Sequence, residues 1–157
     1  KINMEFFSFF YQVNVYGQDL FYHLKGWDSG LQEFVEANNQ FPTIWSIAFF
    51  SALVVYLLYY VILNHPRLNR TWIWACFMGV LFLGVFLTSR SMVIADIIGN
   101  SLHPVDPQLS VSASNAALFG VYNGLLSALF FFLLSLVGRT AGRNVKNVPF
   151  KSLINLK

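Results

Sequence analysis

The chain has 157 residues, of which 56% are hydrophobic and only 11% are charged, and its formal net charge is +3. A soluble globular domain carries roughly 25% charged residues, so this composition excludes an ordinary water-soluble protein. The few basic residues stand beside long apolar stretches, which argues against a nucleic-acid-binding role. We expect an integral membrane protein of the all-α class.

Residues 1–42 are amphipathic rather than uniformly apolar. Between Met4 and Leu24, apolar side chains recur at spacings of three, four and seven among polar ones, the pattern of a helix with one apolar face. We therefore predict an extracytoplasmic segment that begins with an amphipathic, interfacial helix, which Gly17 can break in two. We favour packing of this helix against the chain's own spans; partner binding or membrane sensing is the alternative.

A second short helix is predicted before the first span. Ser29 and Gln32 have the spacing of a capping box, and the apolar side chains of Leu31, Phe34 and Val35 follow in a helical stripe. The polar run Asn38, Asn39 and Gln40 then ends this element.

Three long apolar runs predict a transmembrane bundle over residues 43–138. The spans cover about residues 43–63, 72–98 and 115–138, and about 20 helical residues suffice to cross a hydrocarbon core of about 30 Å. Arg90 interrupts the second run, which we interpret as one long tilted helix with Arg90 near the interface.

Aromatic side chains near the ends of these runs are interpreted as anchors at the membrane interface. At the ends of the runs these are Trp45, Tyr56, Tyr59, Tyr60, Trp72 and Trp74. In the amphipathic N-terminal segment Phe7, Tyr11, Tyr16 and Tyr22 likewise suit an interfacial depth.

Charge placement predicts the orientation. Seven of the ten basic residues lie in the loop of residues 64–71 or in the tail of residues 139–157, and all seven acids fall in segments assigned to the other side. By the positive-inside rule the N-terminus is outside, and the C-terminal tail is cytoplasmic, in a cytoplasmic (inner) membrane. The tail residues predicted to contact anionic lipid, although orientation alone explains their charge, are Arg139, Arg143, Lys146 and Lys151.

The third span carries a ridge of small residues that recurs every four positions. Such a ridge lets another helix approach closely, either within one subunit or between subunits. The predicted helix-packing interface comprises Ala116, Gly120, Gly124 and Ala128, a shorter matching ridge at Ala75 and Gly79, and Asn123 as an interhelical hydrogen-bonding group. A pore-lining role for Asn123 is the alternative.

Arg90 and Asp96 are the ionisable residues nearest to membrane depth. A separation of six places them on different faces of one helix, so we expect no direct ion pair. The favoured interpretation has Arg90 reaching up to the headgroups and Asp96 outside in water. The alternative is a role in ion conduction.

No pattern of residues predicts catalysis. His23, His65 and His103 lie outside the spans, which disfavours haem ligation. Cys76 stands alone, which excludes an intrachain disulfide and a thiolate zinc cluster. Phosphate-binding and nucleophile motifs are missing from the sequence, so we expect no cofactor, no metal, no small-molecule substrate and no enzymatic activity.

The resulting functional hypothesis is a non-catalytic structural subunit or membrane anchor of a larger membrane assembly. Its partners would be the lipid bilayer and other membrane proteins or copies of itself. The alternative is a homo-oligomeric pore or channel. The layout of three spans with an outside N-terminus and a basic tail resembles that of the phage holins that permeabilise the cytoplasmic membrane, although no residue motif accompanies this resemblance.

Overall fold

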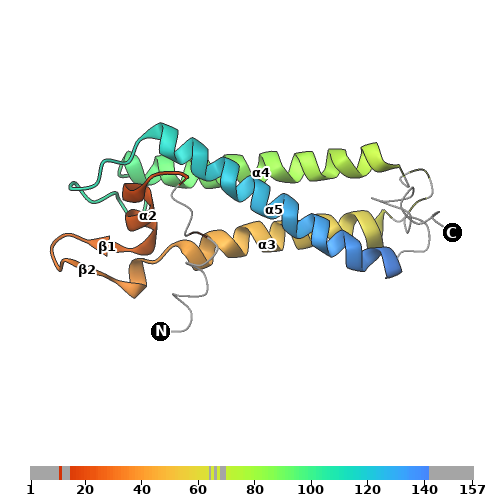
Figure 1. Cartoon of the computed structure of the whole chain (residues 1–157), viewed down its shortest axis with the longest axis horizontal. Helices are drawn as coiled ribbons and strands as arrows, with labels where there is room; N and C mark the ends of the chain where they lie inside the picture. The colour runs from red at the N-terminus through yellow and green to blue at the C-terminus, as the bar shows by residue number, and fades with distance from the viewer. Residues whose placement is uncertain (1–10, 12–14, 64, 66, 68–69, 142–157) are drawn as a thin grey trace. The chain divides into compact units, whose positions relative to one another are not determined.

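The computed structural model describes residue 11 and residues 15–63, 65, 67 and 70–141. Its long helices are α3 (Phe41–Leu57), α4 (Thr71–Ile97) and α5 (Ala113–Ala141) (Figure 1). A short π-helix, η2 (Leu58–Ile62), extends α3, and these three helical segments are long and apolar enough to cross a membrane. The prediction of three helices of membrane-spanning length is therefore confirmed.

The second predicted span is one continuous helix. The helix α4 has 27 residues and passes through Arg90 without a break. An uninterrupted helix bonds all of its central backbone groups internally, which is the state that an apolar surrounding requires.

The described chain divides into two compact units. Unit 1 comprises residues 1–47 and 86–123, and unit 2 comprises residues 48–85 and 124–157. Each of α3, α4 and α5 contributes one part of its length to each unit. The two units group residues that pack against one another. The segments expected from the sequence, in contrast, were divided by their predicted position outside, within or inside the membrane.

The described part of the N-terminal segment contains one short helix, α2 (Gln18–Lys25). It begins after Gly17, whose φ of 99° few other residues adopt. Leu20 and Leu24 are buried on one face of α2. Residues 4–10 and 12–14 of the predicted amphipathic helix lie outside the described residues, so that longer helix stays a prediction.

A β-hairpin stands where the sequence predicts a second short helix. Strands β1 (Trp27–Asp28) and β2 (Glu33–Phe34) pair antiparallel, with Trp27 opposite Phe34. The carboxylate of Asp28 accepts the N–H groups of Gly30 and Leu31, which is the turn that Asx side chains favour over a helix start. The capping-box interpretation was wrong because Ser29 and Gln32 lie in the turn between the two strands, where the N–H of Ser29 donates to the carboxylate of Asp106. A 3₁₀ turn, η1 (Glu36–Asn38), leads to α3.

Aromatic rings form the core of unit 1. Tyr11 stacks on Phe41 with ring centroids 4.8 Å apart, and Tyr16 meets Phe119 edge-on at 5.0 Å. Both tyrosines are fully buried, which corrects the expectation that they anchor the chain at an interface. The described part of the N-terminal segment thus packs within unit 1.

Unit 2 has its own aromatic core. Tyr59, Tyr60 and Trp74 are buried there, and Trp74 stacks on Phe131. Only Trp72 among the expected inner anchors is largely exposed. The belt interpretation was therefore wrong for the three buried residues, whose rings fill the space between helices.

Candidate functional site

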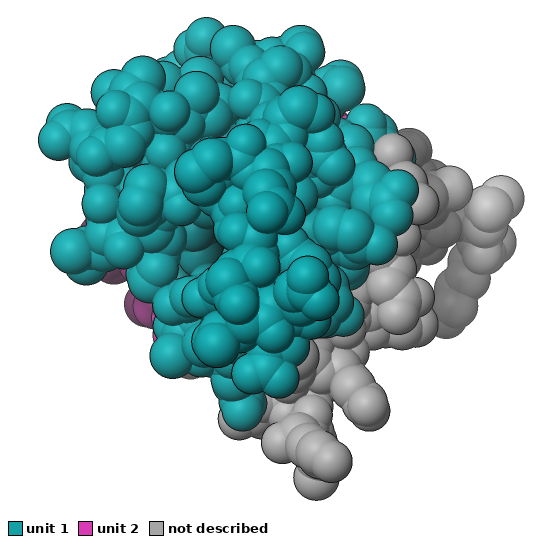
Figure 2. All heavy atoms as spheres, turned by 90° about the vertical axis from the view of Figure 1, so that its left-hand side faces the viewer, with its two compact units in different colours: residues 1–47, 86–123 teal, residues 48–85, 124–157 magenta. Residues whose placement is uncertain are grey.

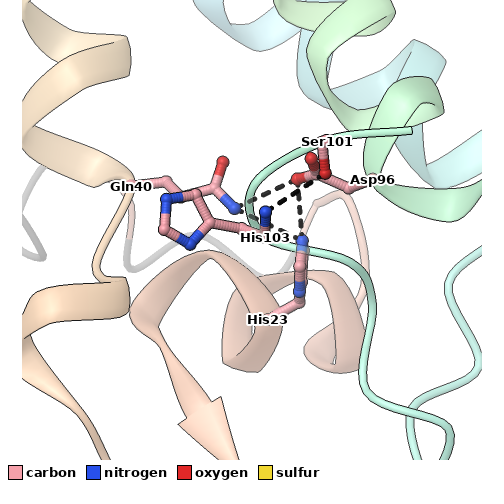
Figure 3. A network of polar contacts seen from close by, with 5 residues as sticks. All are labelled: His23, Gln40, Asp96, Ser101 and His103. Atoms are coloured by element: carbon pink, nitrogen blue, oxygen red, sulfur yellow. Dashed lines mark hydrogen bonds and ion pairs between the residues drawn. The ribbon is translucent and has the colours of Figure 1, made fainter. Parts of the chain in front are cut away.

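A buried polar cluster surrounds the carboxylate of Asp96 in unit 1 (Figure 3). His23 Nε2 lies 2.9 Å from Asp96 Oδ2, and Gln40 Nε2 donates a hydrogen bond of 3.0 Å to the same oxygen. His23 comes from α2, Gln40 precedes α3, and Asp96 lies in the last turn of α4. The cluster therefore joins three elements that are far apart in the sequence.

All three side chains are withdrawn from solvent. Asp96 is 4% exposed, His23 6% and Gln40 7%. A buried carboxylate is tolerated only where donors replace its hydration, and His23, Gln40 and Ser101 supply them. The sequence interpretation of Asp96 as solvated was wrong, because the N-terminal segment covers it.

Backbone hydrogen bonds hold each member of the cluster in place. The N–H of Gln40 donates to the carbonyl of Leu24 at 2.9 Å, and the carbonyl of Asp96 accepts the N–H of Val105 at 3.2 Å. Gly26 ends α2 with φ of 87° and donates its N–H to the carbonyl of His23. The side chains are therefore positioned by backbone contacts on both sides of the cluster.

The geometry indicates which nitrogen of His23 carries a proton. Asp96 accepts hydrogen bonds when ionised, so His23 Nε2 must be the donor at 2.9 Å. Gln40 Nε2 is 3.4 Å from the same ring nitrogen, which is too long to compete with its bond to Asp96. The contact therefore favours the His23 tautomer with its ring hydrogen on Nε2.

A small cavity adjoins the cluster. It has a volume of about 130 Å³, which is roomy enough for ordered water. The residues lining it include His23, Gln40, Trp27, Asn38 and His103. Such a space admits water or a small polar molecule to the imidazoles. Within the described residues, no group of three or more His, Cys, Asp or Glu side chains could hold a metal ion.

Sequence reasoning missed His23 and Gln40 as members of a site. A usable signal existed for His23, because Leu20, His23 and Leu24 have the i, i+3, i+4 spacing of one helical face. A histidine on an apolar face needs a buried partner. Nothing in the local sequence identifies Asp96 as that partner.

The small-residue ridge of α5 meets aromatic side chains of α4. A Cβ added to Gly120 would lie 2.8 Å from the backbone oxygen of Phe86 in unit 1. In unit 2, a Cβ added to Gly124 would lie 2.7 Å from the ring of Phe82. Both glycines thus allow α4 and α5 to approach closely inside one chain.

The other predicted interface residues are placed differently. Ala116 is buried and Ala128 is half-buried on α5, whereas Ala75 on α4 is exposed. A Cβ at Gly79 would have no heavy atom within 4 Å. In the described part of the chain, Ala75 and Gly79 therefore do not form the counterpart of the α5 ridge.

Asn123 is fully buried and bonded within unit 1. Its Oδ1 accepts the hydroxyl of Tyr11 at 2.8 Å, and its Nδ2 donates to the carbonyl of Phe119 at 3.2 Å. Burial raises the pKa of Tyr11 far above its usual range, so the hydroxyl stays a donor. Tyr11 is a partner that the sequence did not predict.

The charged residues singled out in the sequence do not gather at one site. Arg90 is exposed on α4 and Asp96 is buried, and they make no ion pair. Arg139 lies in the last turns of α5, where its side chain is outside the described part. Arg143, Lys146 and Lys151 also lie outside the described residues.

Together the fold and this cluster define a mostly helical protein with three helices suited to a membrane and a polar cluster at one end of α4. No protein-family model, no curated protein and no solved structure matched this chain in the three comparisons made.

Proposed function

We propose that this protein is a non-catalytic structural subunit or membrane anchor of a larger membrane-embedded assembly. The three apolar helices support insertion in a bilayer. The polar cluster supports a structural role for the N-terminal segment, since it fixes α2 and the start of α3 to the end of α4.

Exposed apolar side chains on well-held turns carry the proposal. Leu31 in the turn of the hairpin is 63% exposed, and Leu102 in the segment after α4 is 92% exposed. Figure 2 shows unit 1 from the side on which the hairpin lies. An exposed leucine gains free energy when another protein covers it. We infer that these two turns contact a partner.

The polar groups of α5 support packing rather than a lumen. Asn123 is bonded to Tyr11, and Ser127 and Ser135 donate their hydroxyls to carbonyls of their own helix. All three are buried within their units. A homo-oligomeric pore would need such groups to face a shared aqueous channel, so this arrangement favours the subunit over the channel.

The proposed orientation follows the charge bias. The N-terminus and the cluster lie outside, and the basic tail lies in the cytoplasm of a cell whose inner membrane holds the chain. There Arg139, Arg143, Lys146 and Lys151 would contact anionic headgroups, at about 1 kcal/mol for each charge near the surface.

Photo-crosslinking in native cells tests the proposal. A photoreactive phenylalanine analogue replaces Leu31 or Leu102, with the exposed Gln108 of the same outer segment as the control position. We expect covalent adducts with one foreign protein from the two leucine positions and much weaker adducts from Gln108. Adducts with copies of this chain alone, together with a ring-sized native mass in nanodiscs, would instead favour the pore.

A further inference from the structure

We propose that Arg90 and the hollow beside it on α4 form a binding site for one phospholipid, whose phosphate contacts the guanidinium. This inference rests on the proposed location in a membrane. The proposal assigns a ligand to Arg90, whose charge is not neutralised by any described residue of the chain.

Arg90 is a cation without an anionic partner in the described part of the chain. Its side chain is exposed, and the ion pair found among the described residues joins His23 and Asp96 instead. An arginine within a membrane-spanning helix is costly unless it meets water, a counter-charge or the headgroups. The counter-charge of Arg90 must therefore come from outside the described residues.

The depth of Arg90 favours a headgroup phosphate as that counter-charge. The helix α4 has 27 residues, about 40 Å at 1.5 Å per residue, so it exceeds the hydrocarbon core by about 10 Å. The polar cluster around Asp96 places this excess at the end near Ile97. Arg90 lies seven residues before Ile97, about 10 Å along the axis, which is the boundary between hydrocarbon and headgroups.

The surroundings of Arg90 suit a lipid. An open hollow of about 530 Å³ lies beside it, lined by Leu87, Thr88, Ser91, Ile94 and Ile98 among others. The hydroxyl of Ser91 donates to the backbone carbonyl of Thr88, so Arg90 is the charged donor that faces the hollow. Leu87, one turn toward the hydrocarbon, offers apolar contact to the first part of an acyl chain, whereas Ile94 and Ile98 lie on the headgroup side of Arg90.

The chemistry of the guanidinium matches a phosphate. Its planar fork donates two parallel hydrogen bonds to two phosphate oxygens. A carboxylate from a neighbouring helix is the competing partner. The open apolar hollow beside the guanidinium favours the lipid, because an acyl chain can follow the helix surface without any fixed register.

Native mass spectrometry of the full-length protein tests this site. Wild type, Arg90→Gln, Arg90→Lys and Arg70→Gln are released from nanodiscs of equimolar phosphatidylcholine and phosphatidylglycerol, and short-chain phosphatidylglycerol is then titrated in detergent. We expect Arg90→Gln to lose one retained phospholipid and to weaken binding about fivefold. Arg70→Gln, just before α4, should keep that lipid. Arg90→Lys, which keeps the charge but loses the planar fork, should retain it more weakly than wild type and more strongly than Arg90→Gln.

Two outcomes would overturn the proposal. One is unchanged lipid retention in Arg90→Gln, and the other is loss of a protein partner in Arg90→Gln while the lipid stays bound. If Arg90→Gln does not fold, wild type is labelled with phosphatidylglycerol that carries a diazirine near its headgroup. Adducts should map to residues 87–98, and their absence from that stretch refutes the site. Release of the protein from membranes by alkali would count against the proposed membrane location instead.

Discussion

The imidazole of His23 and the carboxylate of Asp96 lie 2.9 Å apart although 73 positions separate them in the chain. This contact fastens the N-terminal segment to the end of α4. The carboxylate, which the sequence interpretation placed in water, is buried and accepts hydrogen bonds from His23, Gln40 and Ser101.

Removing one member of the pair should destabilise the protein strongly. Asp96→Ala leaves His23 and Gln40 buried without their acceptor, so we expect the free energy of unfolding in mixed micelles to fall by about 3–5 kcal/mol. Glu33→Ala, which removes an exposed carboxylate from β2, should change it by less than about 0.5 kcal/mol. A double-mutant cycle with His23→Ala should give a coupling of about 0.5–3 kcal/mol; additive effects would mean that the pair does not interact.

Alanine at Gly120 should destabilise the helix packing, whereas alanine at Gly79 should not. The new Cβ at Gly120 would lie 2.8 Å from the backbone oxygen of Phe86, and such overpacking costs about 1–3 kcal/mol. Gly79→Ala meets open space and gains up to about 1 kcal/mol of helix propensity. Thermal unfolding of both variants in the same detergent measures the contrast. If the two variants change the melting temperature equally, the α5 ridge does not pack closely against α4.

Tyr11→Phe should weaken unit 1 by removing a donor from Asn123. The loss leaves Asn123 Oδ1 buried without the hydroxyl that lies 2.8 Å away, which costs about 1–3 kcal/mol. Tyr22→Phe is the matched control, because its hydroxyl accepts an exposed hydrogen bond from Gln18. Chemical unfolding in lipid bicelles compares the two. If Tyr11→Phe is neutral while Asn123→Ala alters ion conductance, Asn123 faces a channel.

The contact between Asp106 and Ser29 should depend on acid pH. Hydrogen bonds from Ser29 and from the backbone N–H of Gln108 lower the pKa of Asp106 below its usual value of about 3.8. A carboxyl group with a lowered pKa stabilises the fold above its ordinary pKa, and this contribution is lost as pH falls through the lowered value. Asp106→Asn should therefore be less stable than wild type at neutral pH, and the difference in melting temperature should close in strong acid. If the difference in melting temperature grows as the pH falls, the lowered pKa of Asp106 does not stabilise the fold.

Cysteine accessibility should reveal the orientation of the chain. In a Cys76→Ala background, Glu33→Cys should react with a membrane-impermeant maleimide in intact cells, because the hairpin is predicted to lie outside. His65→Cys, in the loop predicted to be cytoplasmic, should react only after the cells are permeabilised. The reverse pattern would invert the orientation, and equal labelling of both would contradict insertion with a fixed topology.

Local sequence was sufficient for the helices and insufficient for the hairpin. An apolar run of about 20 residues is a property of consecutive side chains, so the bounds of α3, α4 and α5 could be predicted to within a few residues. The segment from Trp27 to Phe34 fits a short helix equally well by spacing. The structure forms a hairpin instead, because Trp27 pairs with Phe34 across the strands and Asp28 closes the turn. Both contacts depend on how the chain folds back, which local spacing does not show.

The sequence by itself determined that this protein has three membrane-length helices, a small-residue ridge on the third and a strong charge bias, because composition and periodicity carry that information directly. Only the tertiary structure decided that Asp96 pairs with His23, that Tyr11 bonds Asn123 across 112 positions, and that Phe82 and Phe86 face the ridge. The physical reason is that a buried polar group requires some partner, but local sequence does not identify which distant residue supplies it.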